Sequence, residues 1–127
     1  MMDDQLTNAS ALIIDDKRDL GELLALRLKL DGIKSVVATS GSEGIRACST
    51  RTFDAAFVDY RLRDMSGLAV ASELKKICPS IKVILITGDA YSFDDAEIVS
   101  PDVDTVLPKP WRPSELEALI RTIRRSA

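Results

Sequence analysis

The chain has 127 residues, 46% of them hydrophobic, which suffices for the core of one domain and leaves no room for a second. Its net charge is only −3 and its basic residues are scattered, which argues against a direct partnership with DNA or RNA. With no histidine and two distant cysteines, the composition also argues against zinc sites, disulfide scaffolds and histidine-based catalysis.

The beginning of the chain carries no targeting pattern. Residues 1–10 are polar and acidic, whereas a signal peptide starts with a basic segment followed by an apolar one. No apolar run approaches the length that spans a bilayer, so we expect no membrane contact. We therefore expect a cytoplasmic protein in which residues 1–127 hold a single domain, residues 1–9 form a flexible N-terminus, and Cys48 and Cys78 are reduced thiols.

Five short apolar runs alternate with segments of helical spacing. The predicted strands are residues 11–14, 35–38, 55–58, 83–86 and 105–107. Because strands this uniformly apolar suit a parallel sheet that is covered on both faces, the pattern predicts a doubly wound α/β fold with right-handed crossovers. We expect the flavodoxin-like (βα)5 arrangement with strand order 2-1-3-4-5.

The first predicted helix, residues 18–30, has more leucines than the others. Its inward stripe is expected to contain Leu20, Leu23, Leu24 and Leu28, broadened by Leu26 and Leu30.

The other predicted helices have clear boundaries except for the fourth. The second spans residues 42–50, and the third spans residues 67–77 with Ser66 as its N-cap. The fourth is short or irregular, because only residues 94–99 have helical character and Pro101 follows them. The fifth begins near Pro113, and its apolar face contains Leu116, Leu119, Ile120 and Ile123.

Reactive side chains collect at the carboxyl ends of the predicted strands, where open parallel sheets bind their ligands. The residues are Asp15, Asp16, Asp59, Thr87 and Lys109. Each alone has an ordinary structural explanation, such as a helix cap, a turn or a surface charge. Three carboxylates at one edge would repel one another unless a hard cation neutralised them, which predicts a Mg²⁺ site. One carboxylate could then attack phosphorus while the hydroxyl and the ammonium hold the phosphoryl oxygens.

Four segments together resemble the receiver domain of two-component response regulators, and the resemblance covers the chain from about Ser10 onward. The segments are LIIDDKRDL, FVDYRLRDMSGL, ILITG and LPKPWRPSEL. The resemblance implies a phosphoprotein of a two-component phosphorelay that acts as a signalling switch, catalysing only its own phosphorylation and slow dephosphorylation. Its partner would be a sensor histidine kinase or a histidine phosphotransfer protein, and it would switch an output domain or a downstream protein.

The resemblance also implies a role for each site residue. Asp59 would be the phosphoacceptor, and Thr87 and Lys109 would hold the phosphoryl oxygens. Asp16 would bind Mg²⁺ directly, Asp15 largely through water, and Asp59 and the backbone carbonyl of Arg61 would complete the metal ligands. Two further implications concern the phosphoryl pocket, namely a cis Lys109–Pro110 bond and phosphate access at Gly88.

Two features of the surface follow from the same resemblance. The side of the first helix nearest the acidic pocket would dock the helical bundle that carries the phosphohistidine. The residues expected on that side are Lys17, Arg18, Gly21, Glu22, Ala25 and Leu26. The chain departs from the family at Arg63, which stands where proline is common, so we expect a less rigid loop after the acceptor.

Three alternatives stay open at this stage. A magnesium-dependent phosphatase with an aspartyl nucleophile would need a D-x-D motif after one strand, whereas the nearest acid to Asp59 is Asp64. A flavodoxin-like nucleotide binder would need a phosphate loop rich in Gly, Ser or Thr, whereas the first loop is Asp15-Asp16. A pseudo-receiver would bind its partner without phosphorylation, although all the chemical positions are filled. The chain could also be a stand-alone receiver or a fragment of a longer regulator or hybrid kinase.

Overall fold

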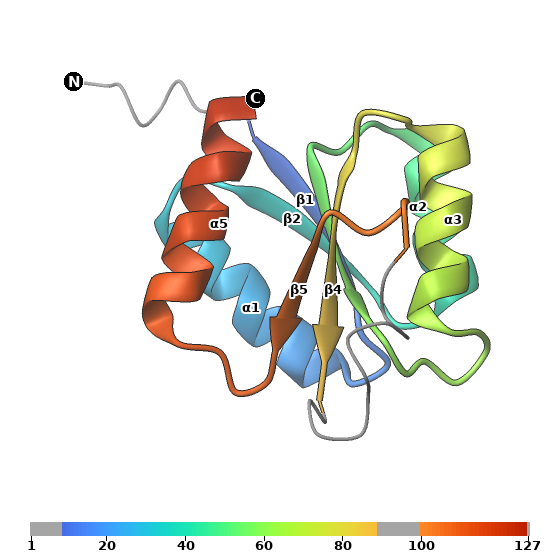
Figure 1. Cartoon of the computed structure of the whole chain (residues 1–127), viewed down its shortest axis with the longest axis horizontal. Coiled ribbons are helices and arrows are strands. Elements are labelled where there is room, and N and C mark those ends of the chain that lie inside the picture. Colours follow the sequence, from blue (N-terminus) through green and yellow to red (C-terminus); the bar gives the residue numbers. More distant parts are fainter. Residues whose placement is uncertain (1–8, 89–99, 127) are drawn as a thin grey trace.

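The computed structural model describes residues 9–88 and 100–126, which form a five-stranded parallel sheet between two layers of helices (Figure 1). The strand order is β2-β1-β3-β4-β5, as predicted. The elements are β1 (Ser10–Ile14), α1 (Arg18–Leu30), β2 (Lys34–Ala38), α2 (Gly41–Thr50), β3 (Ala55–Asp59), α3 (Gly67–Ile77), β4 (Lys82–Thr87), β5 (Thr105–Pro108) and α5 (Pro113–Ser126).

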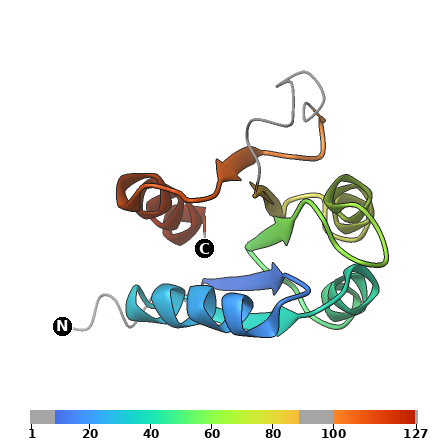
Figure 2. The same ribbon diagram turned by 90° about the horizontal axis from the view of Figure 1, so that it is seen from below.

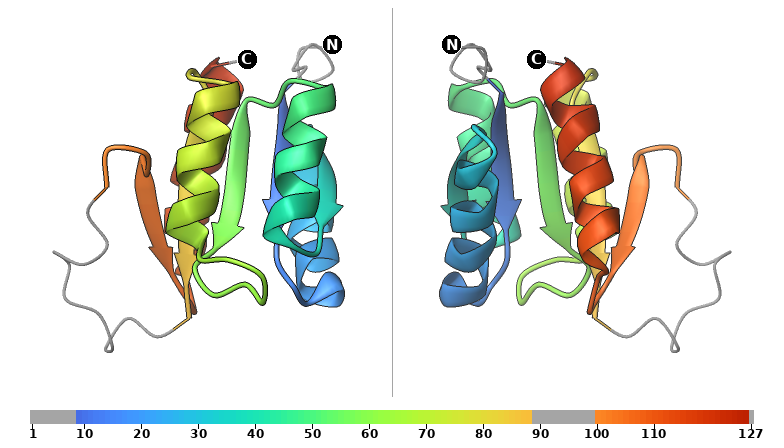
Figure 3. Two further views of the ribbon diagram at one scale, coloured as in Figure 1. Left: turned by 90° about the vertical axis from the view of Figure 1, so that its right-hand side faces the viewer. Right: turned by 90° about the vertical axis from the view of Figure 1, so that its left-hand side faces the viewer.

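Helices cover both faces of the sheet, which explains why the strands are apolar throughout. Helices α2 and α3 lie over one face, and α1 and α5 lie over the other (Figure 3). Successive side chains of a strand point to opposite faces. In β1, Ala11 and Ile13 accordingly join the core cluster beneath α1 and α5, while Leu12 and Ile14 join the cluster beneath α2 and α3.

The second and third helices are capped by serine side chains. Ser40 Oγ accepts a hydrogen bond from Glu43 N (3.0 Å), so α2 begins one residue before its predicted start. Ser66 Oγ accepts from Ala69 N (3.1 Å) and is the predicted N-cap of α3. Both caps satisfy backbone N–H groups that the first turn of a helix leaves without partners.

The predicted inward face of α1 is wrong by part of a turn. Leu24 and Leu28 are buried, but the exposed leucines are Leu20 (42%), Leu23 (63%), Leu26 (58%) and Leu30 (77%). The inward face is centred instead on Gly21, Leu24 and Leu28, which recur at helical spacing.

Gly21 explains this rotation of α1. A Cβ atom at that position would lie 2.8 Å from Val37 Cγ1, so the missing side chain allows α1 to approach β2 closely. Two residues expected on the exposed docking side are therefore turned inward. Gly21 is buried, and Ala25 is half-buried against the core.

Two expectations fall outside the described ranges. The short fourth helix was predicted at residues 94–99, and residues 1–8 belong to the predicted flexible N-terminus. Ala9, the first described residue, is buried. Within the described ranges, no helix is both long and apolar enough to cross a bilayer.

Candidate metal centre

Three carboxylates meet at the carboxyl edge of the sheet, as the sequence predicts. Asp59 is the last residue of β3, and Asp15 and Asp16 directly follow the neighbouring strand β1. One carboxylate oxygen from each residue lies within 4.8 Å of the others. The parallel pairing of β1 with β3 brings these acids together, because Ile14 lies beside Val58 in the register.

The acidic cluster is partly enclosed, and two cationic side chains face it. Lys109 Nζ lies 3.8 Å from Asp15 Oδ2 and 3.9 Å from Asp59 Oδ2. On the other side, Arg63 Nε lies 3.8 Å from Asp16 Oδ2. These N–O distances exceed hydrogen-bond length, so the cations offset the negative charge without direct hydrogen bonds.

The Asp59 carboxyl group is in an environment that disfavours its charge. Burial raises the pKa of Asp59, and the neighbouring Asp15 and Asp16 carboxylates raise it further. The Lys109 ammonium and the Arg61 backbone N–H, which donates to Asp59 Oδ1 at 3.2 Å, act in the opposite direction but leave the pKa raised. A bound divalent cation would favour the ionised form, because it adds positive charge beside three carboxylates.

The remaining predicted residues lie at the ends of β4 and β5. Thr87, the last residue of β4, is buried, and its carbonyl accepts a hydrogen bond from Lys109 N at 2.7 Å. The Lys109–Pro110 bond is cis, as the family resemblance implies. At Gly88 an added Cβ would meet no atom of residues 9–88 or 100–126 within 4 Å, so these parts of the chain leave space at the position expected to admit phosphate.

Arg61 lies in the loop that follows Asp59. Residues 61 and 66 form an antiparallel bridge, and Gly67 N donates to the Tyr60 carbonyl at 2.8 Å. The loop is therefore a closed turn that begins at the acceptor position and ends at the start of α3. The use of the Arg61 carbonyl as a metal ligand stays a prediction.

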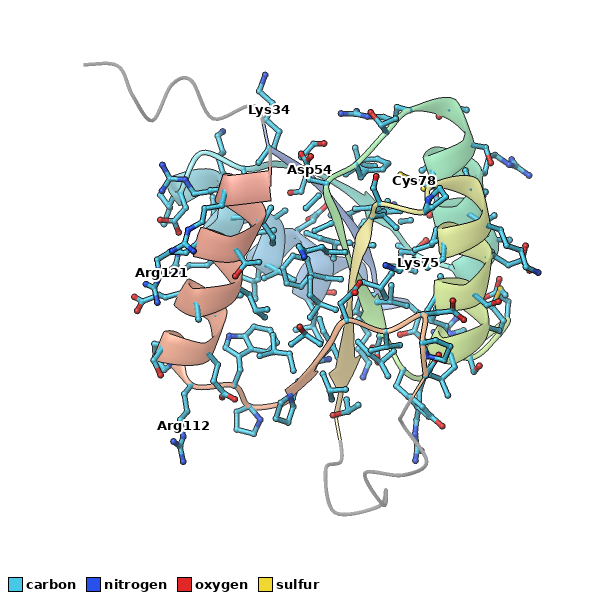
Figure 4. The ribbon with its side chains drawn as sticks, turned by 45° about the horizontal axis from the view of Figure 1, so that its top comes forward. Lys34, Asp54, Lys75, Cys78, Arg112 and Arg121 are labelled. Carbon is cyan, nitrogen blue, oxygen red and sulfur yellow. The ribbon has the colours of Figure 1, made fainter. Side chains whose placement is uncertain are left out.

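Other carboxylates and amines have structural partners away from this edge. Asp54 Oδ2 accepts a hydrogen bond from Ser10 N (2.8 Å) at the opposite end of the sheet (Figure 4). Lys75 Nζ donates to the Ile81 carbonyl (2.6 Å) and to Asp104 Oδ2 (2.9 Å), which joins α3 to the starts of β4 and β5. These groups are too far along the strands to contribute to the acidic cluster.

The donor set fits Mg²⁺. The cluster offers carboxylate oxygens and contains no imidazole or thiolate, which are the ligands that favour zinc. It is open enough to solvent for a small cation to keep several water ligands, because the Asp16 side chain retains 19% exposure.

An apolar groove of about 740 Å³ between α1 and α5 leads to the carboxylates. Its walls include Leu20, Leu23, Leu24, Arg27, Trp111 and Leu116, and one end reaches Asp15, Gly88 and Lys109. Figure 2 shows α1 and α5 on the same side of the sheet, opposite α2 and α3. The sequence interpretation missed this groove because it placed Leu20 and Leu23 in the core. The signal that could have found it is the spacing of Gly21, Leu24 and Leu28.

Comparisons with known proteins agree with this geometry. Residues 11–121 match the family described as the response regulator receiver domain. The transcriptional regulatory protein GlrR of Escherichia coli (strain K12) is 33% identical over 80% of this chain and 23% of its own length. A response regulator receiver protein of Anaeromyxobacter sp. (strain Fw109-5) is 36% identical over 78% of this chain and 42% of its own length. The chain thus spans less than half the length of either relative.

Solved structures resemble the fold along most of the chain. The response regulator protein TrrA from Thermotoga maritima, in complex with Mg(2+)-BeF, is similar with a TM-score of 0.80 and 28% identity over 91% of this chain and 98% of that one. A CheY-like receiver domain protein from Methanospirillum hungatei JF-1 has a TM-score of 0.82 at 24% identity, covering 94% of this chain and 96% of its own.

Proposed function

The chain belongs to the response regulator receiver domain family and is a signalling domain of two-component systems, and on this premise we propose that Asp59 is its phosphoacceptor. The observation that carries the proposal is the meeting of three carboxylates with Lys109 at one sheet edge. The TrrA structure, which holds Mg(2+)-BeF on a similar fold, supports the same chemistry.

In the proposed reaction, a carboxylate oxygen of Asp59 attacks the phosphorus of a phosphohistidine on a partner protein. A new P–O bond forms, the P–N bond breaks, and the imidazole leaves with the electron pair of that bond. The hydrogen bond from Arg61 N to Asp59 Oδ1 orients the carboxylate. Lys109 and the Thr87 hydroxyl are the proposed partners of the equatorial oxygens, because both lie at the adjoining strand ends.

The proposed metal ligands are Asp15, Asp16, Asp59 and the Arg61 carbonyl. Bound Mg²⁺ would neutralise the acids and the charge of the incoming phosphoryl group. Asp15 is held in place by Lys17 N, which donates to Asp15 Oδ1 at 2.9 Å, and by its own N–H, which donates to the Ala38 carbonyl at 3.0 Å. These bonds leave Asp15 Oδ2 facing the cluster.

The groove between α1 and α5 is the proposed docking site of the phosphohistidine partner, a sensor histidine kinase or a phosphotransfer protein. The groove ends at Asp15 and Lys109, so a helix lying on it would bring a reactive side chain to Asp59. Leu20, Leu23 and Leu24 line the α1 flank of the groove at positions i, i+3 and i+4, which suits the packing of a partner helix.

The domain is proposed to act as a cytoplasmic switch that catalyses only its own phosphorylation and slow dephosphorylation. The name of GlrR, a transcriptional regulatory protein, supports an output domain or a downstream partner that responds to the switch. Residues 1–127 are proposed to hold a single receiver domain, with the match itself covering residues 11–121.

Beryllofluoride binding tests the site without a cognate kinase. Trp111 lines the groove together with Lys109, so its fluorescence is a local reporter. We expect a change when Mg²⁺ and beryllofluoride are both present, reversal by EDTA, and no beryllofluoride response in Asp59→Asn. Glu73→Gln, which changes a partly exposed carboxylate on α3 that pairs with Lys76, is the matched control and should respond like the unmodified protein. A full response of Asp59→Asn would contradict the assignment.

A further inference from the structure

The loop between Asp59 and α3 is anchored to the beginning of α2. Asp64 Oδ1 accepts a hydrogen bond from Gly41 N (2.9 Å), and Asp64 Oδ2 accepts from Ser42 N (3.0 Å) and Ser42 Oγ (3.0 Å). These bonds use N–H groups of the first turn of α2, where a negative charge is favourable. The anchor lies outside the three acids of the metal cluster.

Met65, the residue after Asp64, packs against the same end of α2. A Cβ atom on Gly41 would lie 2.5 Å from Met65 Cγ, so Met65 packs directly on the glycine at the start of α2. The bridge between residues 61 and 66 closes the other side of the turn. Arg63 thus lies in a short loop whose backbone is held from both ends, although it replaces the proline common in the family.

The anchored loop directs the Arg63 side chain to one carboxylate of the cluster. Its Nε lies 3.8 Å from Asp16 Oδ2, while the side chain itself is 87% exposed. Lys109 faces the other two acids, Asp15 and Asp59. Among the described residues, each acid of the cluster therefore has a cation beside it, and Arg63 covers the most exposed acid.

We propose that Arg63 is a resident counter-ion of Asp16 that opposes magnesium binding and so sets the magnesium concentration at which this receiver becomes competent. The inference rests on the proposed function, since it assigns a role toward the same metal. Mg²⁺ at Asp16 would lie a few ångströms from the guanidinium, and the two cations repel each other while sharing one carboxylate.

The expected size of the effect is small but measurable. Exposed ion pairs contribute between about 0 and 1 kcal/mol, which corresponds to a change in affinity of up to roughly five-fold. Because the backbone of the loop is held, fewer conformations compete with the one in which Arg63 and Asp16 are paired. We therefore expect the change in affinity to lie in the upper part of this range. The effect must also depend on salt, since the screening length falls from about 30 Å at 0.01 M to about 3 Å at 1 M ionic strength.

Magnesium titration of the full chain, followed by Trp111 fluorescence and by calorimetry, tests the inference. Arg63→Gln removes the charge and keeps most of the side chain, and we expect it to tighten magnesium binding roughly two- to five-fold at low salt. Arg63→Lys should stay near the unmodified affinity. Lys76→Gln removes the same charge from the end of α3, where Lys76 pairs with Glu73, and should change nothing.

Salt dependence separates this role from a structural one. The difference between Arg63→Gln and the unmodified protein should shrink as ionic strength rises, whereas a distorted loop would give a difference that persists. Equal or weaker magnesium binding by Arg63→Gln would overturn the inference, as would an equal gain in Lys76→Gln. Failure of the unmodified chain to bind Mg²⁺ would instead overturn the proposed metal site itself.

Discussion

Replacing Gly67 by alanine should damage both stability and the acceptor site. Gly67 is the first residue of α3, and a Cβ there would lie 2.6 Å from the Asp59 carbonyl oxygen and 2.9 Å from Tyr60 Cα. These obstacles are backbone atoms, which cannot rotate away. The start of α3 or the acceptor loop must therefore move.

The magnitude follows from two opposing effects. Overpacking of a buried position costs about 1–3 kcal/mol. The gain in helix propensity from Gly to Ala is at most about 1 kcal/mol, and it is smaller at the first turn. The free energy of unfolding should therefore fall by about 1–2 kcal/mol, which lowers the midpoint of thermal unfolding by roughly 3–8 °C for a chain of this size.

Thermal and urea unfolding measure this loss, and labelling by acetyl phosphate measures the damage at Asp59. Gly44→Ala is the comparison for labelling, because its added Cβ would meet the Cδ1 and Cγ1 atoms of the buried Ile14 side chain and not the backbone of the acceptor loop. It should also lower stability, since Ile14 is packed in the core, but leave labelling intact. The reasoning is refuted if Gly67→Ala is as stable as the unmodified protein, or if Gly44→Ala loses as much labelling as Gly67→Ala.

Three further predictions concern other parts of the fold. Backbone hydrogen bonds to Asp64 hold its pKa below the usual range, so its contribution to stability is present above about pH 4 and is lost as pH falls through the lowered pKa. Asp64→Ala should therefore lower the free energy of unfolding by about 1 kcal/mol near pH 7. Urea unfolding at a series of pH values should show this difference shrinking in acid, and a difference that stays constant would contradict the prediction. Burial raises the pKa of the Cys48 thiol, so a thiol reagent should modify half-buried Cys78 first, and equal rates would count against the packing of α2. Leu23→Asp should slow transfer from a phosphohistidine protein while leaving acetyl phosphate labelling unchanged; equal loss of both reactions would count against the docking groove.

The sequence predicts most of this fold because its signals are local. Each strand is a short apolar run, and the caps at Ser66 and near Ser40 mark the beginnings of helices. The cluster of Asp15, Asp16 and Asp59 was predictable because parallel strands place their carboxyl ends at one edge. Only the strand order was needed to bring these residues together.

The orientation of α1 could not be predicted in the same way. Its leucines, among them Leu20, Leu23 and Leu24, offer more apolar surface than one helix face can bury, so hydrophobicity alone does not select the face. Close approach to β2 selects it, through the missing side chain of Gly21. The contact between Arg63 and Asp16 depends on the anchoring of a loop to a distant helix, which no local pattern encodes.

Mass spectrometry after incubation with acetyl phosphate tests the central proposal most directly. The unmodified chain should gain one phosphoryl group that is labile to hydroxylamine, and the gain should require Mg²⁺. Asp59→Asn should gain none, while Glu73→Gln, which changes a partly exposed carboxylate on α3, should be labelled like the unmodified chain. Undiminished labelling of Asp59→Asn, or labelling that persists after EDTA has removed the metal, would contradict the assignment of Asp59 as a magnesium-dependent phosphoacceptor.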